Sequence, residues 1–277
     1  MNLGDAYLNL GQDEKALAAF DRAVEISATP VVWNNIAYQL SLKSAHLDKA
    51  QQYAESAVAA TAAELRNLRL EQLSSRDLAL VPSLIAYWDT LGWVHFGRGD
   101  LDRAEKYVSA AWLLGQHGEV GDHLGQIYEK RGQKQKAIET YALAINGLRP
   151  IPETRARLAA LVGGEDKVAP TVTKYKQELQ TLRTLDVGKL TSQSASADFF
   201  VLFSPTASGV TVDNVKYVSG DEKLKPFADA LRKAQYNLTL PDGTPTKILR
   251  RGVLSCPSTG GDCHFVMLLT DDVRSVD

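Results

Sequence analysis

The amino-acid sequence predicts a mainly α-helical protein, a helical solenoid followed by a small α+β domain. Three observations lead to this prediction. Over about residues 1–148, small and aromatic residues recur with a period of 33 to 34, which is typical of stacked two-helix units. Within each unit the apolar residues follow helical spacing. After Ala197 the pattern changes to short runs rich in Val, Thr, Tyr and Phe, which favour strands.

The composition excludes several classes of protein. Of 277 residues, 44% are hydrophobic and 23% are charged, which is enough apolar side chain to build a core. No run of about 18 apolar residues occurs, so we expect no membrane-spanning helix. The formal net charge of −2 provides no overall field to attract nucleic acid.

The chain begins inside a helical pattern. Residues 1–7 carry neither the basic start nor the apolar stretch of a signal peptide. They match the middle of a two-helix unit whose beginning is missing. We therefore expect the chain to be a piece of a longer protein.

Pairs of small residues mark the repeat. Gly4 and Ala37 are 33 residues apart, as are Gly92 and Gly125. Small residues at these positions let the two helices of a unit approach closely. Further glycines stand where a helix should end in a left-handed cap, namely Gly11, Gly99 and Gly132.

These positions resemble the tetratricopeptide repeat family, whose pattern of Trp, Leu-Gly, Tyr, Ala, Phe and Ala recurs in four places over about residues 1–148. The matches are Leu3, Gly4, Tyr7, Ala16, Phe20 and Ala23; Trp33, Ile36, Ala37, Leu40, Ala50 and Ala57; Trp88, Leu91, Gly92, Ala104, Val108 and Ala111; and Leu124, Gly125, Tyr128, Ala137, Tyr141 and Ala144. The resemblance implies a concave groove, lined by the first helix of each unit, that binds a protein or a peptide.

The position in the repeat predicts which residues line this groove. They are Asp5, Asn34, Tyr38, Asp89, Trp93, Asp122, His123 and Gln126. Some members of the family hold a peptide carboxylate with Lys, Arg and Asn, but Asp5, Asp89 and Asp122 would repel it. We therefore expect a basic or polar partner. The alternative interpretation is that these residues are solvated and bind nothing.

The histidines do not predict a metal site. His95 occupies a core position of the repeat, and His117 and His123 are six residues apart across a turn. That spacing is poor for one metal ion on a helix. We expect neither a metal nor a cofactor.

The repeat is interrupted once and is followed by a connecting region. An insertion near residues 61–82 suggests an extended helix with a short turn ending near Pro82, which either packs on the array or projects toward a partner. Residues 149–196 are expected to hold capping helices, over 153–162 and 174–185, and then a polar linker over 189–197.

Residues 197–277 predict a β-β-α-β-β domain with one helix on an antiparallel sheet. The expected strands cover 199–203, 210–218, 246–255 and 264–270, the helix starts near Asp221, and a turn falls at Asp242-Gly243. We interpret the basic cluster of Lys247, Arg250 and Arg251 as a solvated sheet face.

This domain is similar to the TonB C-terminal domain family. The similarity lies in the sequence Val-Lys-Tyr-Val-Ser-Gly at 215–220, the amphipathic helix, Tyr236, and the Pro-Asp-Gly-Thr-Pro turn at 241–245. The receptor-contacting Tyr-Pro motif of that family is absent, so only the fold is implied. Such sheets often have an open edge that can accept a partner strand.

The two cysteines lie at the expected junction of the last two strands. Cys256 and Cys263 would face each other at the end of a hairpin, close enough for a disulfide. Two free thiols, or a metal or catalytic role, are the alternatives. A disulfide would place the domain outside the cytoplasm, in the periplasm or cell envelope of a bacterium, with the cytoplasm as the alternative.

The patterns together predict a non-catalytic interaction scaffold rather than an enzyme. The sequence shows no nucleophile–base pair, phosphate-binding glycine loop or metal-ligand set. One alternative is the docking or regulatory part of a larger envelope enzyme, because the combination resembles bacterial envelope proteins with a transglutaminase-like region ahead of the repeats. The other is an envelope transport component of the TonB type.

Overall fold

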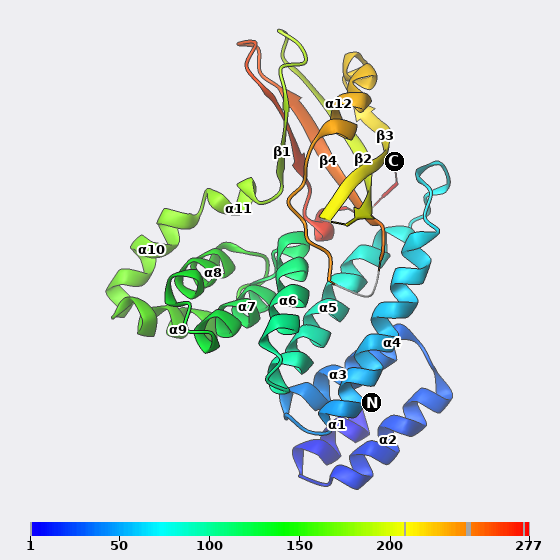
Figure 1. The fold of residues 1–277 in the computed structure, drawn as a ribbon, viewed down its shortest axis with the longest axis vertical. Helices are drawn as coiled ribbons and strands as arrows, with labels where there is room; N and C mark the ends of the chain where they lie inside the picture. Colours follow the sequence, from blue (N-terminus) through cyan, green and yellow to red (C-terminus); the bar gives the residue numbers. More distant parts are fainter. Residues whose placement is uncertain (1, 208, 242–244, 274, 277) are drawn as a thin grey trace.

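The computed structural model describes residues 2–207, 209–241, 245–273 and 275–276. It has two parts, a stack of helices and a sheet that stands at one end of it (Figure 1). The helices of the stack are α1 (Asn2–Asn9), α2 (Asp13–Ile26), α3 (Pro30–Leu42), α4 (Leu47–Arg66), α5 (Leu80–Gly97), α6 (Leu101–Gly115), α7 (Gly118–Lys130), α8 (Lys134–Asn146), α9 (Pro152–Val162), α10 (Val168–Tyr175) and α11 (Glu178–Thr181). Among the described helices, none is both long and apolar enough to cross a membrane.

Local sequence explains where these helices begin and end. Pro30 and Pro152 each occupy the first turn of a helix, where a missing N–H costs nothing. Asp100 caps α6, since its carboxylate accepts from the Arg103 N–H at 3.1 Å. The left-handed caps expected between helices are present, with positive φ at Gly11, Gly99 and Gly132.

Three of the four repeats bring their two helices together where a glycine of the first helix faces a bulkier residue of the second. A Cβ on Gly4, Gly92 or Gly125 would lie within 2.5 Å of its opposing side chain. Those side chains follow sixteen residues later and are fully buried, namely Phe20, Val108 and Tyr141. In the second unit Ala37 takes the place of the glycine and is fully buried. The predicted solenoid of two-helix units is therefore confirmed.

The segment between the second and third units connects the solenoid to the sheet. Helix α4 is extended, and two short 3-10 turns follow, η1 (Leu70–Gln72) and η2 (Asp77–Ala79). Leu70 is buried, and Glu71 accepts a hydrogen bond of 2.8 Å from the Asn214 side chain of the sheet. Pro82 lies in the first turn of α5 rather than at the end of the preceding turn.

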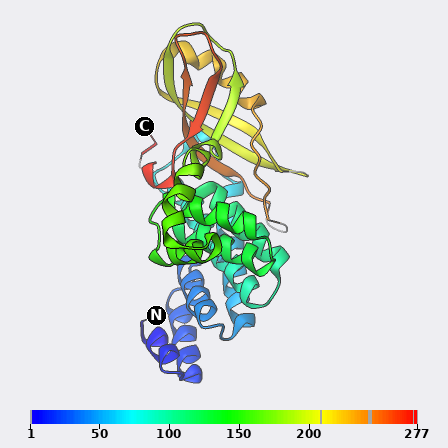
Figure 2. The ribbon, with the colours of Figure 1, turned by 90° about the vertical axis from the view of Figure 1, so that its left-hand side faces the viewer.

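The sheet is antiparallel, with strand order β1-β5-β4-β2-β3. It curls around a short helix, α12, which lies against β3 and β1 (Figures 1 and 2). The elements are β1 (Thr184–Gly188), β2 (Ala195–Thr206), β3 (Gly209–Gly220), η4 (Glu222–Phe227), α12 (Ala228–Lys233), β4 (Ile248–Cys256), β5 (Cys263–Met267) and η5 (Thr270–Asp272). The turn predicted at 242–243 lies outside the described residues.

The mainly helical fold with a small α+β part is confirmed, but the sheet has one strand more than predicted. Strand β1 lies where the sequence suggested the end of a helix. Its buried residue, Leu185, continues the helical spacing of Tyr175, Leu179 and Leu182. A single buried position is compatible with either period, so only pairing with β5 decides that this segment is a strand.

The basic cluster on β4 is not a solvated face. Arg250 is 3% exposed and donates to the Leu114 carbonyl at 2.8 Å and to the Leu268 carbonyl at 2.7 Å. Arg251 pairs with Asp198 at 3.0 Å. The interpretation as a solvated face was wrong for Arg250, since its guanidinium joins the sheet to the end of α6.

The glycine contacts predict a steric test. A Gly125→Ala change would place a Cβ 2.1 Å from the buried Tyr141 ring. We expect it to lower the free energy of unfolding by about 1–3 kcal/mol, measured by urea denaturation. The control is Gly97→Ala at the end of α5, where the Cβ would meet Leu47 at 3.4 Å. That change should be neutral or stabilise by up to about 1 kcal/mol. Equal stability of the two variants would contradict the packing argument.

The disulfide predicts a second effect on stability. Cys256 and Cys263 are bonded and close a loop with a sequence separation of seven. The double change of both cysteines to Ser should lower the free energy of unfolding by about 2.5 kcal/mol in the chain-entropy model. Chemical denaturation of the oxidised wild type and the variant measures this. Adding reductant to the variant should change nothing, and an unaltered denaturation midpoint between the two proteins would argue against the prediction.

Candidate functional site

The inner face of the solenoid contains a hollow between the first helices of three successive repeats. The hollow measures about 300 Å³. Asn34 and Tyr38 of α3 line one side, and Ile85 and Asp89 of α5 line another. The beginning of α7 and the loop after α8 complete the wall. The Ile85 side chain makes part of this wall apolar, and it is almost fully buried.

One side of the hollow presents hydrogen-bond acceptors. The Asn34 side chain is 8% exposed, and its Oδ1 atom is buried with no hydrogen-bond partner among the described residues. The Tyr38 hydroxyl donates to Glu119 Oε1 at 2.6 Å. Burial raises the pKa of Tyr38, and the Glu119 carboxylate raises it further, so this hydroxyl stays a donor. A buried acceptor without a donor is costly, and the residue that carries this one lines the hollow.

A buried ion pair between His123 and Asp89 lies beside the hollow. His123 Nδ1 lies 2.9 Å from Asp89 Oδ1 and 3.1 Å from Oδ2, and both residues are buried. Burial lowers the pKa of His123, but the Asp89 carboxylate raises it, and the net direction is upward. The His123 ring stacks on Trp93, with 4.0 Å between ring centroids. The negative charge of Asp89 is therefore balanced inside the protein by His123.

Asp122 is compensated in the same way by the capping helix α9. It is 1% exposed, and it accepts from the Thr154 hydroxyl at 2.8 Å and from Arg157 Nη1 at 2.9 Å. The Gln126 side chain also donates to it at 2.8 Å. Asp122 and Gln126 are not among the residues that line the hollow; Asp122 instead joins α9 to α7, and Gln126 donates to it from the same helix.

Asp5, predicted to line the groove, and His95, predicted to lie in the core, are both outside this hollow. Asp5 is on α1 at the far end of the solenoid, where burial raises the pKa of its carboxyl. His95 is 2% exposed and stacks on Tyr107, and burial lowers its pKa. The structure thus brings together Asn34, Tyr38 and Asp89 around the hollow, with Trp93 and His123 beside Asp89.

The opposite end of the hollow carries an arginine that the sequence did not single out. His117 and Arg149 line it there. Arg149 Nη2 lies 2.6 Å from Asp271 Oδ2, and His117 Nε2 lies 3.6 Å from Asp271 Oδ1. Arg149 falls between Leu148 and Pro150 in a segment that the sequence marks only as a connection, so no pattern pointed to it.

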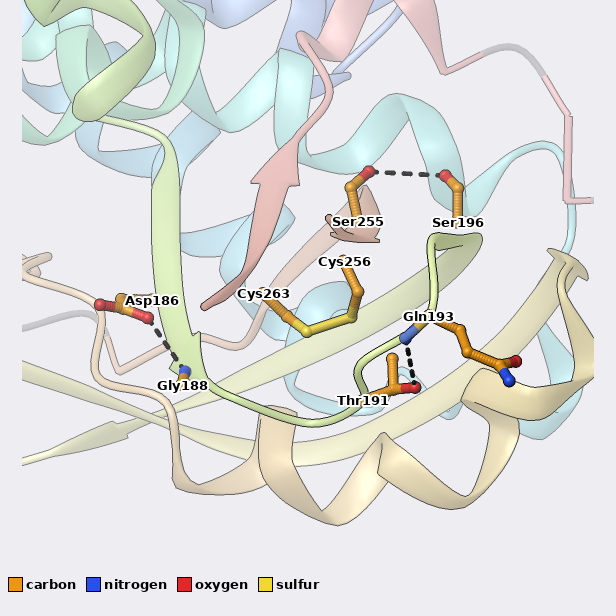
Figure 3. Close-up of a disulfide and its surroundings, with 8 residues drawn as sticks. All are labelled: Asp186, Gly188, Thr191, Gln193, Ser196, Ser255, Cys256 and Cys263. Atoms are coloured by element: carbon orange, nitrogen blue, oxygen red, sulfur yellow. Dashed lines mark hydrogen bonds between the residues drawn. A yellow bond between two sulfur atoms is a disulfide. The ribbon is translucent and has the colours of Figure 1, made fainter. Parts of the chain in front are cut away.

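The cysteines lie away from the hollow. They join β4 to β5 beside the loop over 189–194, at the end of the sheet farthest from the stack of helices α1 to α11 (Figures 1 and 3). Cys256 is 4% exposed and Cys263 is fully buried. Within the described ranges, no group of three or more His, Cys, Asp or Glu is arranged to hold a metal ion. The free-thiol interpretation does not hold in this structure.

Comparison with known proteins identifies the solenoid. Family models described as tetratricopeptide repeat match residues 1–30 and 122–156. The first and fourth two-helix units of this chain are therefore tetratricopeptide repeats. A curated relative, the TPR repeat-containing protein MJ1428 of Methanocaldococcus jannaschii, is 29% identical over 136 residues. That match covers 49% of this chain, which spans only about a fifth (20%) of the relative's length.

Two solved structures are similar to the chain at low identity. MamA matches with a TM-score of 0.41 and 16% identity, covering 66% of this chain and 95% of that one. The thermophilic TPR protein TTC0263 of Thermus thermophilus matches with a TM-score of 0.31 and 20% identity, covering 58% of this chain and 96% of that one.

The buried His123–Asp89 pair of the array predicts a pH effect. The pKa of His123 is raised in the folded protein, so the pair stabilises fully below about pH 6.5 and loses this contribution as pH rises through the raised pKa. His123→Gln should remove that fall. Urea midpoints from about pH 5.5 to 9 measure it.

The control for this experiment is His264→Gln, because His264 is exposed on β5. This variant should keep the pH dependence of the wild type. Parallel curves for wild type and His123→Gln would show that the pair does not titrate as expected.

Proposed function

We propose that the chain is a non-catalytic interaction scaffold that binds a polypeptide segment in the hollow between α3, α5 and α7. The observation that carries the proposal is the buried, unpartnered Oδ1 atom of Asn34 beside the Tyr38–Glu119 pair. A tetratricopeptide array is a general support for protein or peptide binding, since its first helices present a concave face.

The chemistry of the wall fits a peptide. A backbone N–H supplies the donor that Asn34 Oδ1 lacks. Ile85 and Val120 provide apolar contact, and both are mostly buried already, so they lose little freedom on binding. The volume of about 300 Å³ lies at the lower end of the range for ligand sites. It suits one or two side chains of a longer segment.

The charges favour a polar segment over a strongly basic one. The carboxylates of Asp89 and Asp122 are each engaged by a cationic side chain of the array, His123 and Arg157. Glu119 remains the acidic group of the wall that a basic side chain could approach. We propose a partner with N–H donors and at most a single cation at this end.

A cell-envelope location is a further proposal, supported by the disulfide between Cys256 and Cys263. Thiol titration of the protein from its native host tests it, and two reactive thiols would overturn it. A docking role within a larger envelope enzyme, and an envelope-transport role of the TonB type, stay predictions that no contact described above favours.

A change at Asn34 tests the proposed function. We expect Asn34→Leu to weaken binding of peptides from an acetylated, amidated peptide array by about tenfold, because it removes the acceptor. The free protein should keep or gain stability, because the buried unpartnered oxygen is gone. Affinity is measured by fluorescence anisotropy of array-selected peptides, and stability by urea denaturation.

The control for this change is Asn35→Leu. Asn35 is the next residue of α3, is half-buried and does not line the hollow. Its substitution should leave peptide affinity unchanged. If the full chain binds no peptide, or if both variants bind like the wild type, the hollow is not the binding site.

A further inference from the structure

A carboxylate of the sheet part lies on the cationic end of the hollow. Asp271 belongs to η5, a short turn that lies between the sheet and the helices (Figure 1). It contacts both Arg149 and His117, at 2.6 and 3.6 Å. Both Arg149 and His117 line the hollow, and Asp271 is 122 residues from Arg149 in the sequence. A distant segment therefore supplies the counter-charge at this end.

The backbone holds Arg149 and His117 in place. The Leu148 N–H donates to the Gln116 carbonyl at 2.8 Å, and the Gly118 N–H donates to the Leu148 carbonyl at 2.6 Å. These bonds tie the loop after α8 to the beginning of α7, so His117 and Arg149 lie side by side. A Cβ on Gly118 would lie 2.5 Å from the Pro150 backbone, so the approach is as close as the chain allows.

Arg149 also adopts a backbone conformation that is uncommon for its residue type. Its φ is +47°, in the left-handed region that L side chains with a Cβ seldom occupy. Such conformations persist where the surroundings impose them, and they gather at binding sites. Here the imposed conformation belongs to an arginine that is 77% exposed at the edge of the hollow.

We propose that Arg149 and His117 recognise an acidic side chain of the bound polypeptide, and that Asp271 occupies this place in the free chain. The inference rests on the proposed function, since it names the partner chemistry of the same hollow. The favoured segment carries N–H donors for Asn34 and, farther along, a carboxylate that replaces Asp271. An arginine fork matches a carboxylate in geometry and charge, which gives direction as well as attraction.

The intramolecular contact sets the strength of this recognition. An acidic peptide must displace Asp271 before it reaches Arg149, so part of its binding energy is spent on that exchange. The pair is largely solvent-exposed on the arginine side, and exposed ion pairs of this kind change equilibria only about two- to fivefold. The contact thus lowers affinity for acidic segments without closing the hollow.

The test uses the full chain with three variants and the same acetylated, amidated peptide array. Asp271→Asn is isosteric and removes the competing charge. It should strengthen binding of peptides that contain Asp or Glu about two- to fivefold and leave uncharged peptides unchanged. Arg149→Gln should weaken the acidic peptides by at least as much, and the double variant should show no gain over Arg149→Gln. Arg232→Gln on α12, whose partner is Asp229, is the matched control that should alter nothing.

The outcomes separate this inference from the proposed function. Binding of uncharged peptides that depends on Asn34, with acidic peptides unaffected by Asp271→Asn, would overturn the inference and leave the proposed function intact. An equal gain for acidic and uncharged peptides would also overturn it, because the variant would then act through folding rather than charge. Binding of no peptide by wild type or Asp271→Asn would overturn both.

Discussion

The close approach of two helices at one small residue per repeat, a glycine in three of the four units, is the contact on which the rest of the structure depends. Gly125 lies against the Tyr141 ring with no room for a Cβ, and Gly92 lies in the same way against Val108. This contact sets the spacing within a unit, and stacking the units then turns the first helices to one side. The hollow between α3, α5 and α7 is a consequence, because its walls are those first helices.

A second set of contacts fixes the sheet to this stack. Arg250 reaches from β4 to the carbonyl at Leu114 of α6, and the turn after α4 hydrogen-bonds to β3 through Glu71 and Asn214. Leaving the Leu114 carbonyl without its donor would be costly, since it would be a buried unpaired acceptor. The position of Asp271 beside the hollow therefore follows from packing between the two parts of the chain.

The sequence was enough to predict the repeating two-helix units and the ends of their helices. Period and residue size predicted the two-helix units, and the glycine caps at 99 and 132 marked the ends of helices. It was not enough where a single contact decides the outcome. The position of Leu185 is compatible with a helix as well as a strand. The sequence around Arg250 does not distinguish it from a surface arginine, and only its contact with α6 shows that it is buried. Both depend on partners more than 70 residues away, which local patterns do not encode.

The same limit applies to the charge of the groove. Helical position placed Asp89 and Asp122 on first helices, and this predicted an acidic surface. The structure adds His123, which lies on the next repeat, and Arg157, which lies on the capping helix, and each engages one of those carboxylates. At the other end, Arg149 and His117 in turn contact Asp271 of the sheet part. Charge around the hollow is thus set by the elements that flank the repeats as much as by the repeats, so separating the array from its cap and sheet would change that charge.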